Sequence, residues 1–224
     1  LLGEVKFRAG MNLYFDRHDG EAATIEDFLA CFEEAGGTDL GQFALWYSQA
    51  GTPLLTVSAN YDKSKKALSL EVEQTLAPTP DQNAKQPMLI PLGLGLVGKD
   101  GGEIVPDAIS GVEIDAGGIA RLTKRKHRIT MKGIEDRPAL SLNRGFAAPV
   151  IVDIAQTKPD LALLARHDGD LFNRWEAAQD YALRMLLPAA RALARNALPK
   201  WDRNYFEILA ENATDDTLEP AYRA

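Results

Sequence analysis

Cysteine is almost absent from this sequence, and its scarcity excludes several kinds of protein. Cys31 is the only cysteine among 224 residues, so no disulfide can form within the chain and no cysteine pair can complete a zinc site. Cys31 lies in an apolar helical pattern, where a small, partly buried side chain is the simplest interpretation. A reduced, cytoplasmic setting is therefore expected.

Long apolar runs and an excess of positive charge are also missing. No apolar stretch approaches the roughly 20 residues that a membrane-spanning helix needs, and we expect a soluble protein without a membrane partner. The net charge of −7 argues against nucleic acid as a partner. The short basic run from Lys124 to Arg128 is interpreted as a solvated segment entering a strand, because no aromatic residues interrupt it.

Histidine is scarce, which limits metal and acid–base chemistry. His18, His127 and His167 are spread over three segments, and no H-E-x-x-H motif occurs. His18 and His167 each stand between Arg and Asp at an expected helix end, where a cation interacts favourably with the helix dipole. The sequence therefore assigns no catalytic, cofactor-binding or metal-binding residue, and we expect the chain to be inactive alone.

One glycine-rich stretch, Gly93 to Asp100 (GLGLVGKD), partly fits two nucleotide-binding patterns. It matches G-x-G-x-x-G and the start of G-x-x-x-x-G-K, but Asp100 stands where a phosphate loop needs Ser or Thr. Both patterns also require a helix next, whereas turn and extended residues follow. The stretch instead predicts a strand that ends in a hairpin turn at KDGG.

The first fifty residues predict three helices. Apolar residues from about Gly3 to Arg17 cover more than one helical face, and Gly20 can end this first helix. Thr24 caps a second helix with Asp27 in the third position, and Asp39 begins a short third one.

Between Gly51 and about Ile154 the pattern changes to that of half-buried strands. LTVSANY, ALSLEVEQTL and HRITMKGI alternate apolar and polar residues, and turn clusters such as YDKSKK and KDGGE separate these runs. Several short strands at this spacing favour an antiparallel β-sandwich.

Helical periodicity returns after residue 155. Asp160 begins a short helix, and Asp170 begins a long one that is expected to end or kink at Pro188. The predicted fold is therefore multi-segment α and β, with N-terminal helices, a central antiparallel β-sandwich and a C-terminal α-helical segment. No N-cap residue precedes the first helix and the final TLEPAYRA only starts a helix, so we expect a fragment of a larger protein.

Three landmarks resemble bacterial aminopeptidase N, the zinc-dependent alanyl aminopeptidases of the thermolysin-like gluzincin group. They are LLGE..F..GMNLYFDRHDGEAATIEDF, WYSQAGTPLLTV and DGDLFNRWEAAQ, which follow in the same order over essentially the whole chain. PTPDQNAKQPMLIPLGLGL is similar to the stretch that begins strands of a β-sandwich in that family.

The resemblance implies three parts. Residues 1–50 resemble the helical end of the catalytic domain, residues 51–155 the β-sandwich domain, and residues 156–224 the start of the C-terminal helical domain. The parent enzyme, a metallopeptidase and hydrolase, would hold zinc and remove N-terminal amino acids from peptide substrates. Its zinc and substrate motifs do not occur here, so the resemblance implies a non-catalytic segment that links the catalytic and helical domains.

A free-standing β-sandwich module that binds a carbohydrate or a protein, without enzymatic activity, is the alternative. It explains the strands and the missing site, but not the unstarted first helix or the unfinished last one. The length of the natural open reading frame distinguishes the two interpretations.

We predict that the chain self-associates through its N-terminal helices. Phe7, Met11 and Phe15 can pack on the second helix, which leaves Val5 and Leu13 on another face. Exposed apolar surface costs about 25 cal/mol per Å², so a contiguous patch favours a partner. Light scattering should show oligomers of the chain and monomers of a Val5→Glu/Leu13→Glu variant. A wild-type chain that stays monomeric at high concentration and binds no hydrophobic dye would contradict this.

Overall fold

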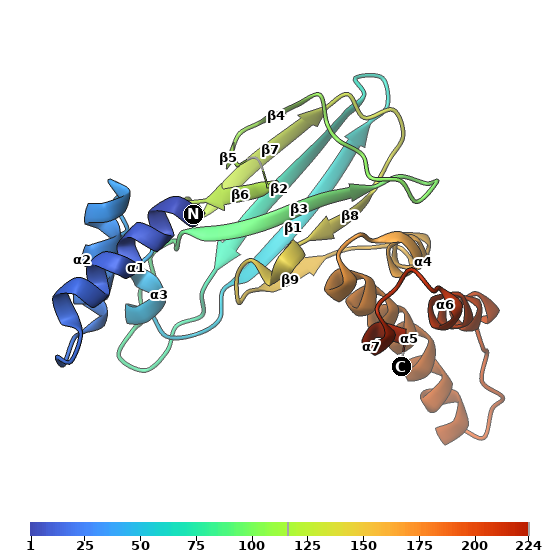
Figure 1. The fold of residues 1–224 in the computed structure, drawn as a ribbon. Coiled ribbons are helices and arrows are strands. Elements are labelled where there is room, and N and C mark those ends of the chain that lie inside the picture. The colour runs from blue at the N-terminus through green and yellow to red at the C-terminus, as the bar shows by residue number, and fades with distance from the viewer. Residues whose placement is uncertain (116, 224) are drawn as a thin grey trace.

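The computed structural model describes residues 1–115 and 117–223, which form N-terminal helices, two β-sheets and C-terminal helices in chain order (Figure 1). The helical segments lie at opposite ends of the sheets in this view. This arrangement confirms the predicted fold class, with a sandwich-like region between two groups of helices.

One of the three N-terminal helices begins at a side-chain cap, and the other two begin without one. Helix α1 spans Glu4–His18, α2 spans Ile25–Gly36 and α3 spans Leu45–Ser48. Thr24 and Asp27 form the predicted capping box of α2, each side chain accepting from the other residue's backbone N–H. The predicted helix start at Asp39 is wrong, because Asp39 accepts from the Gly41 N–H in a turn and α3 begins six residues later.

Helix α1 contacts α2 through a face that sequence periodicity only partly predicts. Gly10 is buried against the ring of Phe32, and a Cβ at Gly10 would lie 2.5 Å from Phe32 Cδ1. Phe7 stacks beside it, with ring centroids of Phe7 and Phe32 5.2 Å apart. The expected packing of Phe15 on α2 stays a prediction, and this side chain is 54% exposed. Tyr14 contacts Phe28 of α2, with ring centroids 5.1 Å apart. The lack of a side chain at position 10 lets the two helices approach closely.

Two sheets make up the sandwich. Their order is β4-β7-β2-β1-β9 in the five-stranded sheet and β5-β6-β3-β8 in the four-stranded sheet. The strands are β1 (Leu54–Asp62), β2 (Ala67–Thr75), β3 (Ile90–Val97), β4 (Ala108–Ser110), β5 (Glu113–Ile114), β6 (Ile119–Leu122), β7 (Lys126–Lys132), β8 (Ala139–Leu142) and β9 (Ile151–Ile154).

One strand pair departs from the predicted antiparallel arrangement. Strand β9 runs parallel to β1, with Leu54 opposite Ile151 and Val57 opposite Ile154, whereas the other strand pairs in the two sheets are antiparallel. A tight hairpin would force antiparallel pairing, but nearly the whole sandwich lies between these two strands in sequence. The chain can therefore return to the β1 edge in the same direction.

The sandwich core follows the predicted alternation closely in β2 and β7, and only partly in β1. Leu55 and Val57 are buried, whereas Ala59 is exposed and Tyr61 is half-buried. The Tyr61 hydroxyl lies 2.6 Å from the Glu135 carbonyl oxygen. Burying one such aliphatic side chain contributes about 1.5–3 kcal/mol, so the shared core between the sheets dominates the stability of this region. The most deeply buried members are Leu55, Leu70, Met88, Ile90, Leu92, Leu122, Ile129, Met131 and Ile134.

The C-terminal segment holds α4 (Lys158–His167), α5 (Leu171–Ala194), α6 (Arg203–Thr214) and α7 (Pro220–Arg223). Asp170 caps α5 as predicted, since its carboxylate accepts from the Asn173 N–H at 2.9 Å. Of the two predicted outcomes at Pro188, an end or a kink of the helix, the end is wrong, because α5 continues to Ala194. Pro188 lies on an exposed stretch of the helix, where a carbonyl left without an N–H partner can be solvated. Within residues 1–115 and 117–223, no helix has the length and apolar character needed to cross a bilayer.

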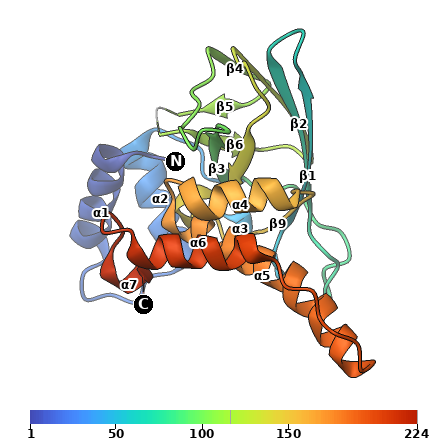
Figure 2. The same ribbon diagram turned by 90° about the vertical axis from the view of Figure 1, so that its right-hand side faces the viewer.

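The C-terminal helices share a core with the sandwich. Val97 of β3 and Ala139 of β8 belong to the same buried cluster as Leu161 and Leu164 of α4 and Ile208 of α6. Figure 2 shows α4 lying under the sheets, with α6 and α5 beyond it. The shared apolar core fixes α4 against the ends of β3 and β8.

Asp160 links the start of α4 to the sandwich. It should also contribute to the way the free energy of unfolding changes at acidic pH. Its carboxylate accepts from the Thr157 N–H at 2.9 Å. It also accepts from Nη1 and Nη2 of the Arg137 guanidinium group, at 2.7 and 2.9 Å. Burial by itself raises the pKa of Asp160, but the bonds from Arg137 and Thr157 outweigh burial and lower it overall. A lowered pKa stabilises the fold above the ordinary value of 3.8, and this contribution is lost as pH falls below it.

We predict that Asp160→Asn lowers the free energy of unfolding by about 1–3 kcal/mol at pH 7, because charge-assisted hydrogen bonds are lost. The difference from the wild-type chain should shrink as pH falls below 3.8. Urea titrations at several pH values measure both effects. Glu207→Gln, which removes an exposed pair with Arg203 on α6, serves as the control. An equal loss in both variants, or no change of the difference with pH, would refute this role.

Candidate functional site

The three histidines do not form a site. His18 and His167 lie in the last turns of α1 and α4, as predicted, and His127 lies in β7. Among the residues that the structure describes, no three His, Cys, Asp or Glu side chains are grouped so that they could hold a metal ion. The donor set therefore does not fit a zinc centre in this part of the chain.

His127 has a structural role inside the sandwich. Its Nε2 accepts hydrogen bonds from the backbone N–H groups of Thr123 and Lys124, both at 3.0 Å. An imidazole that accepts at Nε2 is neutral, and burial lowers the pKa of His127. Lys126 and Arg128, on either side, pair with Glu73 and Glu71 of the adjacent strand β2. Two cations of the basic run, Lys126 and Arg128, are thus paired across the sheet.

The glycine-rich stretch forms a strand and a turn, as predicted. Strand β3 ends at Val97, and the Gly98 N–H donates to the Gly102 carbonyl at 2.7 Å in the following turn. Two of its glycines have a further role that sequence reasoning missed. A Cβ at Gly93 would lie 2.5 Å from the Arg144 carbonyl oxygen, and a Cβ at Gly95 would lie 1.9 Å from Arg144 Cζ. Both glycines make room on one face of β3 for Arg144.

Arg144 connects the sandwich to the C-terminal helices. Its Nε donates to Ser141 Oγ at 2.8 Å, and its Nη1 donates to Glu103 Oε1 at 2.6 Å. Its Nη2 donates to Asp168 Oδ1 at 3.0 Å, in the turn between α4 and α5. One guanidinium group therefore joins β8, the loop after β3 and the helical segment. We call Arg144, Ser141, Glu103, Asp168 and Asn173 the polar junction.

Asn173 completes the polar junction from α5. Its Nδ2 donates to Ser141 Oγ and to the Leu142 carbonyl oxygen, both at 2.8 Å. Asp168 also accepts from the Asp170 N–H at 3.0 Å, which fixes the turn that leads into α5. Burial raises the pKa of Asp168, although its hydrogen bonds and the charge of Arg144 oppose this shift.

The residues of the polar junction carried no signal in the sequence beyond the glycine spacing. Gly93 and Gly95 alternate on one strand face, which indicates that another group approaches the backbone closely. Which group approaches cannot be read from the strand, because Arg144 lies outside it in a short 3₁₀ segment, Arg144–Phe146.

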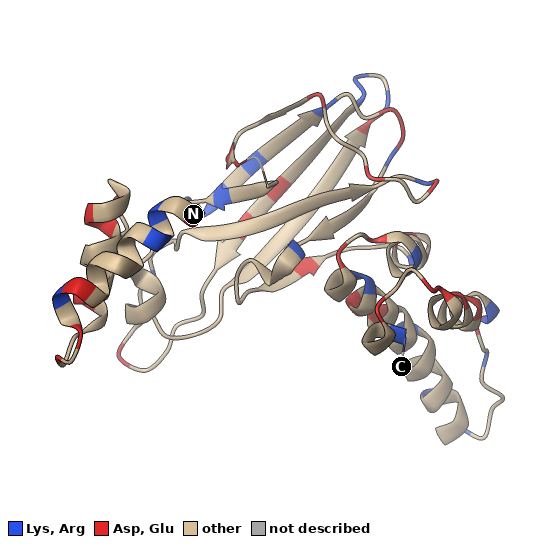
Figure 3. Cartoon of the chain, in the orientation of Figure 1, with Lys and Arg blue, Asp and Glu red and all other residues tan. Residues whose placement is uncertain are grey.

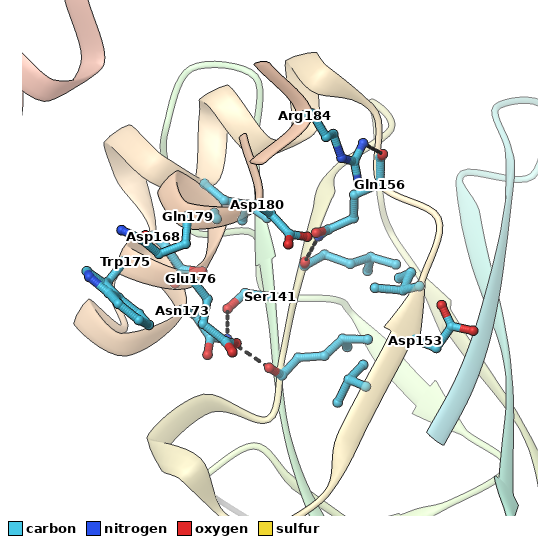
Figure 4. Close-up of a pocket in the computed structure, with 16 residues that line it drawn as sticks. Ser141, Asp153, Gln156, Asp168, Asn173, Trp175, Glu176, Gln179, Asp180 and Arg184 are labelled. Atoms are coloured by element: carbon cyan, nitrogen blue, oxygen red, sulfur yellow. Dashed lines mark hydrogen bonds between the residues drawn. The ribbon is translucent and has the colours of Figure 1, made fainter. Parts of the chain in front are cut away.

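A cleft of about 550 Å³ lies beside the polar junction, between the sandwich and α5 (Figure 4). Strands β8 and β9 form one wall and α5 forms the other. Arg184 bridges the walls, since its Nη1 donates to the Gln156 carbonyl oxygen at 2.6 Å. The polar residues that line this acidic cleft are Ser141, Asp153, Gln156, Asp168, Asn173, Glu176, Gln179, Asp180 and Arg184.

A second hollow, of about 600 Å³, lies between the N-terminal helices and the sandwich. Its walls are mostly apolar, and they include Phe7 of α1, which is 53% exposed. We call it the apolar groove. Among the residues that line it are Leu2, Phe7, Phe28, Phe32, Phe43, Tyr47, Pro91 and Ile119.

Two family models match adjacent parts of the chain. DUF3458, a domain of unknown function with an Ig-like fold, matches residues 51–155. DUF3458_C, a domain of unknown function described as ARM repeats, matches residues 158–224. The first match covers the two-sheet region and the second covers α4 to α7.

Curated relatives match nearly the full chain. Aminopeptidase N of Caulobacter vibrioides is 39% identical over 224 residues, which are 100% of this chain and 24% of that protein. Aminopeptidase N of Escherichia coli K12 is 37% identical over 179 residues, which are 80% of this chain and 20% of that protein. The chain thus spans about a quarter of the length of these relatives or less.

A solved structure shares the fold. The crystal structure of Legionella pneumophila aminopeptidase A in complex with aspartic acid matches with a TM-score of 0.78 and 25% identity. The match covers 97% of this chain and 23% of that one. Helices and sheets are therefore arranged alike over almost all of the chain.

We predict that Gly95→Ala lowers the free energy of unfolding by about 3 kcal/mol or more, because the new Cβ displaces the Arg144 guanidinium from its buried partners. Urea unfolding measures the loss. Gly169→Ala is the control in the adjacent turn, since a Cβ there meets no atom within 4 Å.

A double variant tests the cause. Gly95→Ala in an Arg144→Ala background should cost much less than in the wild-type chain, because the group that it displaces is already gone. Equal costs in the two backgrounds would show that Gly95 acts independently of Arg144.

Proposed function

Because this chain is homologous to bacterial aminopeptidase N over about a quarter of that enzyme's length, we propose that it is a non-catalytic segment of a zinc aminopeptidase. The parent would remove N-terminal amino acids from peptides in the cytoplasm, with zinc and the peptide bound outside this chain. The segment would join the catalytic domain to the C-terminal helical domain.

One observation carries this proposal. The aligned region takes in all 224 residues of the chain but 24% of the Caulobacter enzyme, so most of that enzyme lies outside the match. The described residues of this chain offer no cluster of three metal-ligating side chains. A metal-dependent reaction therefore requires residues beyond those described here.

The polar junction supports an architectural role. A link between two domains must fix their relative orientation, and here the partly buried guanidinium of Arg144 and a shared apolar core do so. Buried polar contacts of this kind are demanding in geometry, because each unpaired group would cost free energy. The sandwich and the first helices of the following segment thus behave as one body.

The exposed apolar side chains of α5 support the proposal that this segment packs within a larger helical domain. Beyond Arg184 it carries little charge, as Figure 3 shows, and several of its apolar side chains are exposed. Helical repeats bury such faces by stacking on a neighbouring repeat. The exposed large apolar residues of α5 are Phe172, Trp175, Leu183, Leu186, Leu187 and Leu193.

Self-association through the N-terminal helices is part of the proposal for the isolated chain. Val5 of α1 is 82% exposed, which favours contact with another apolar surface. Leu13 is half-buried, so Val5 carries more of the expected effect than Leu13 does.

The alternative is a free-standing sandwich module that binds a carbohydrate or a protein. The Ig-like match over residues 51–155 is compatible with it, since this architecture serves many functions. Its decisive test is the natural reading frame. A frame that ends near both ends of this chain would favour the module.

We expect the isolated chain to bind no stoichiometric zinc and to hydrolyse no aminoacyl substrate. Metal analysis of the purified chain and an alanyl-anilide assay measure both properties. The full-length parent, assayed beside it, should lose activity when a chelator is added. One tightly held zinc ion per chain, or chelator-sensitive turnover by the chain alone, would overturn the proposed role.

A further inference from the structure

A short turn at residues 123–125 carries the chain from one sheet to the other. Strand β6 of the four-stranded sheet ends at Leu122, and β7 of the five-stranded sheet begins at Lys126. We call residues 123–125 the crossover turn. Because these residues lie outside both strands, their backbone N–H and carbonyl groups need partners other than the regular ladder of either sheet.

Two N–H groups of the crossover turn converge on one histidine nitrogen. The backbone N–H groups of Thr123 and Lys124 both donate to Nε2 of His127, which is a buried side chain. The ring of His127 also hydrogen-bonds the backbone of Gly111, which follows β4. One imidazole therefore holds the crossover turn in place, and it does so only while Nε2 carries no proton.

The carbonyl groups of the crossover turn contact other parts of the chain. Nε2 of Gln42, which lies just before α3, donates to the Thr123 carbonyl oxygen at 2.7 Å. Nε2 of Gln74, on β2, donates to the Lys124 carbonyl oxygen at 3.0 Å. Thr123 is thus bonded to His127 through its N–H group and to the N-terminal segment through its carbonyl group. A movement of Thr123 away from His127 therefore also disturbs its bond to Gln42.

The surroundings of His127 favour its neutral form. Burial lowers the pKa of His127, the hydrogen bond to Gly111 opposes this shift, and the positive charge of Lys124 adds to it. A folded-state pKa below the ordinary value of 6.5 means that the ring contributes stability above pH 6.5, and that this contribution is lost as pH falls below it. The other charged groups on the neighbouring segments are in ion pairs, which are Lys126–Glu73, Arg128–Glu71 and Arg121–Glu113. Arg125 of the crossover turn donates to the Lys85 carbonyl oxygen.

We propose that His127 is a pH-sensitive switch that releases the crossover turn when its Nε2 takes up a proton. The new N–H group on the ring cannot accept a hydrogen bond, so the N–H groups of Thr123 and Lys124 must turn away to other acceptors. The bond between Thr123 and Gln42 then breaks, and the N-terminal helices lose a contact with the sandwich. The switch depends on contacts within this chain and is separate from the proposed aminopeptidase role.

Hydrogen exchange of the whole chain at about pH 7.5 and about pH 5.5, corrected for the intrinsic effect of pH on exchange rates, tests the proposal. We expect the protection of residues 119–127 to fall about tenfold at the lower pH, because one pH unit below 6.5 favours a protonated, open form by up to tenfold. The segment around Gln42 should lose protection with it. In His127→Gln, Oε1 can accept the same N–H groups without titrating, so protection should stay within about twofold. The control His18→Gln, at the end of α1, should respond to pH as the wild-type chain does.

An NMR titration of the wild-type chain tests the same switch without relying on a variant that folds. We expect the amide resonances of Thr123 and Lys124 to shift together with protonation of the His127 ring. A ring that becomes protonated while both amide resonances stay unchanged would overturn the proposal. So would equal losses of protection in the wild-type chain and His127→Gln, or protection of residues 119–127 that does not change between the two pH values.

Discussion

The guanidinium group of Arg144 is the contact on which the relation between sandwich and helices depends. It reaches Glu103 and Ser141 on the sandwich and Asp168 in the turn before α5. A buried ion pair adds little net stability when it is intact, because desolvation offsets the attraction. Breaking it leaves a buried charge unpaired and is costly. The polar junction therefore fixes geometry more than it adds stability.

The rest of the structure around the polar junction follows from that geometry. Gly95 must lack a side chain so that the guanidinium can lie against β3. Asp168, held by Arg144, accepts from the Asp170 N–H, and Asp170 then caps α5. Helix α5 forms one wall of the acidic cleft, so the position of Glu176 opposite β9 also depends on this chain of contacts.

Homology and geometry describe different aspects of this chain. The chain is homologous to aminopeptidase N along about a quarter of that enzyme's length, and the Ig-like and ARM-repeat models match residues 51–155 and 158–224. The acidic cleft is described by the side chains that line it, which come from the sandwich and from α5. The glycine pattern that resembles a nucleotide-binding motif instead leaves space for Arg144. The spacing of glycines alone therefore does not identify a ligand.

The sequence by itself determined the fold class, the helix starts at Thr24 and Asp170, and the absence of a zinc-binding motif. Capping depends on residues within one turn, and strand alternation depends on the nearest neighbours, so both can be read locally. Only the tertiary structure decided the parallel pairing of β9 with β1, the close contact of Gly10 with Phe32, and the position of Arg144 against β3. Each of these joins segments that are distant in sequence, and such contacts depend on how whole elements pack rather than on local propensity.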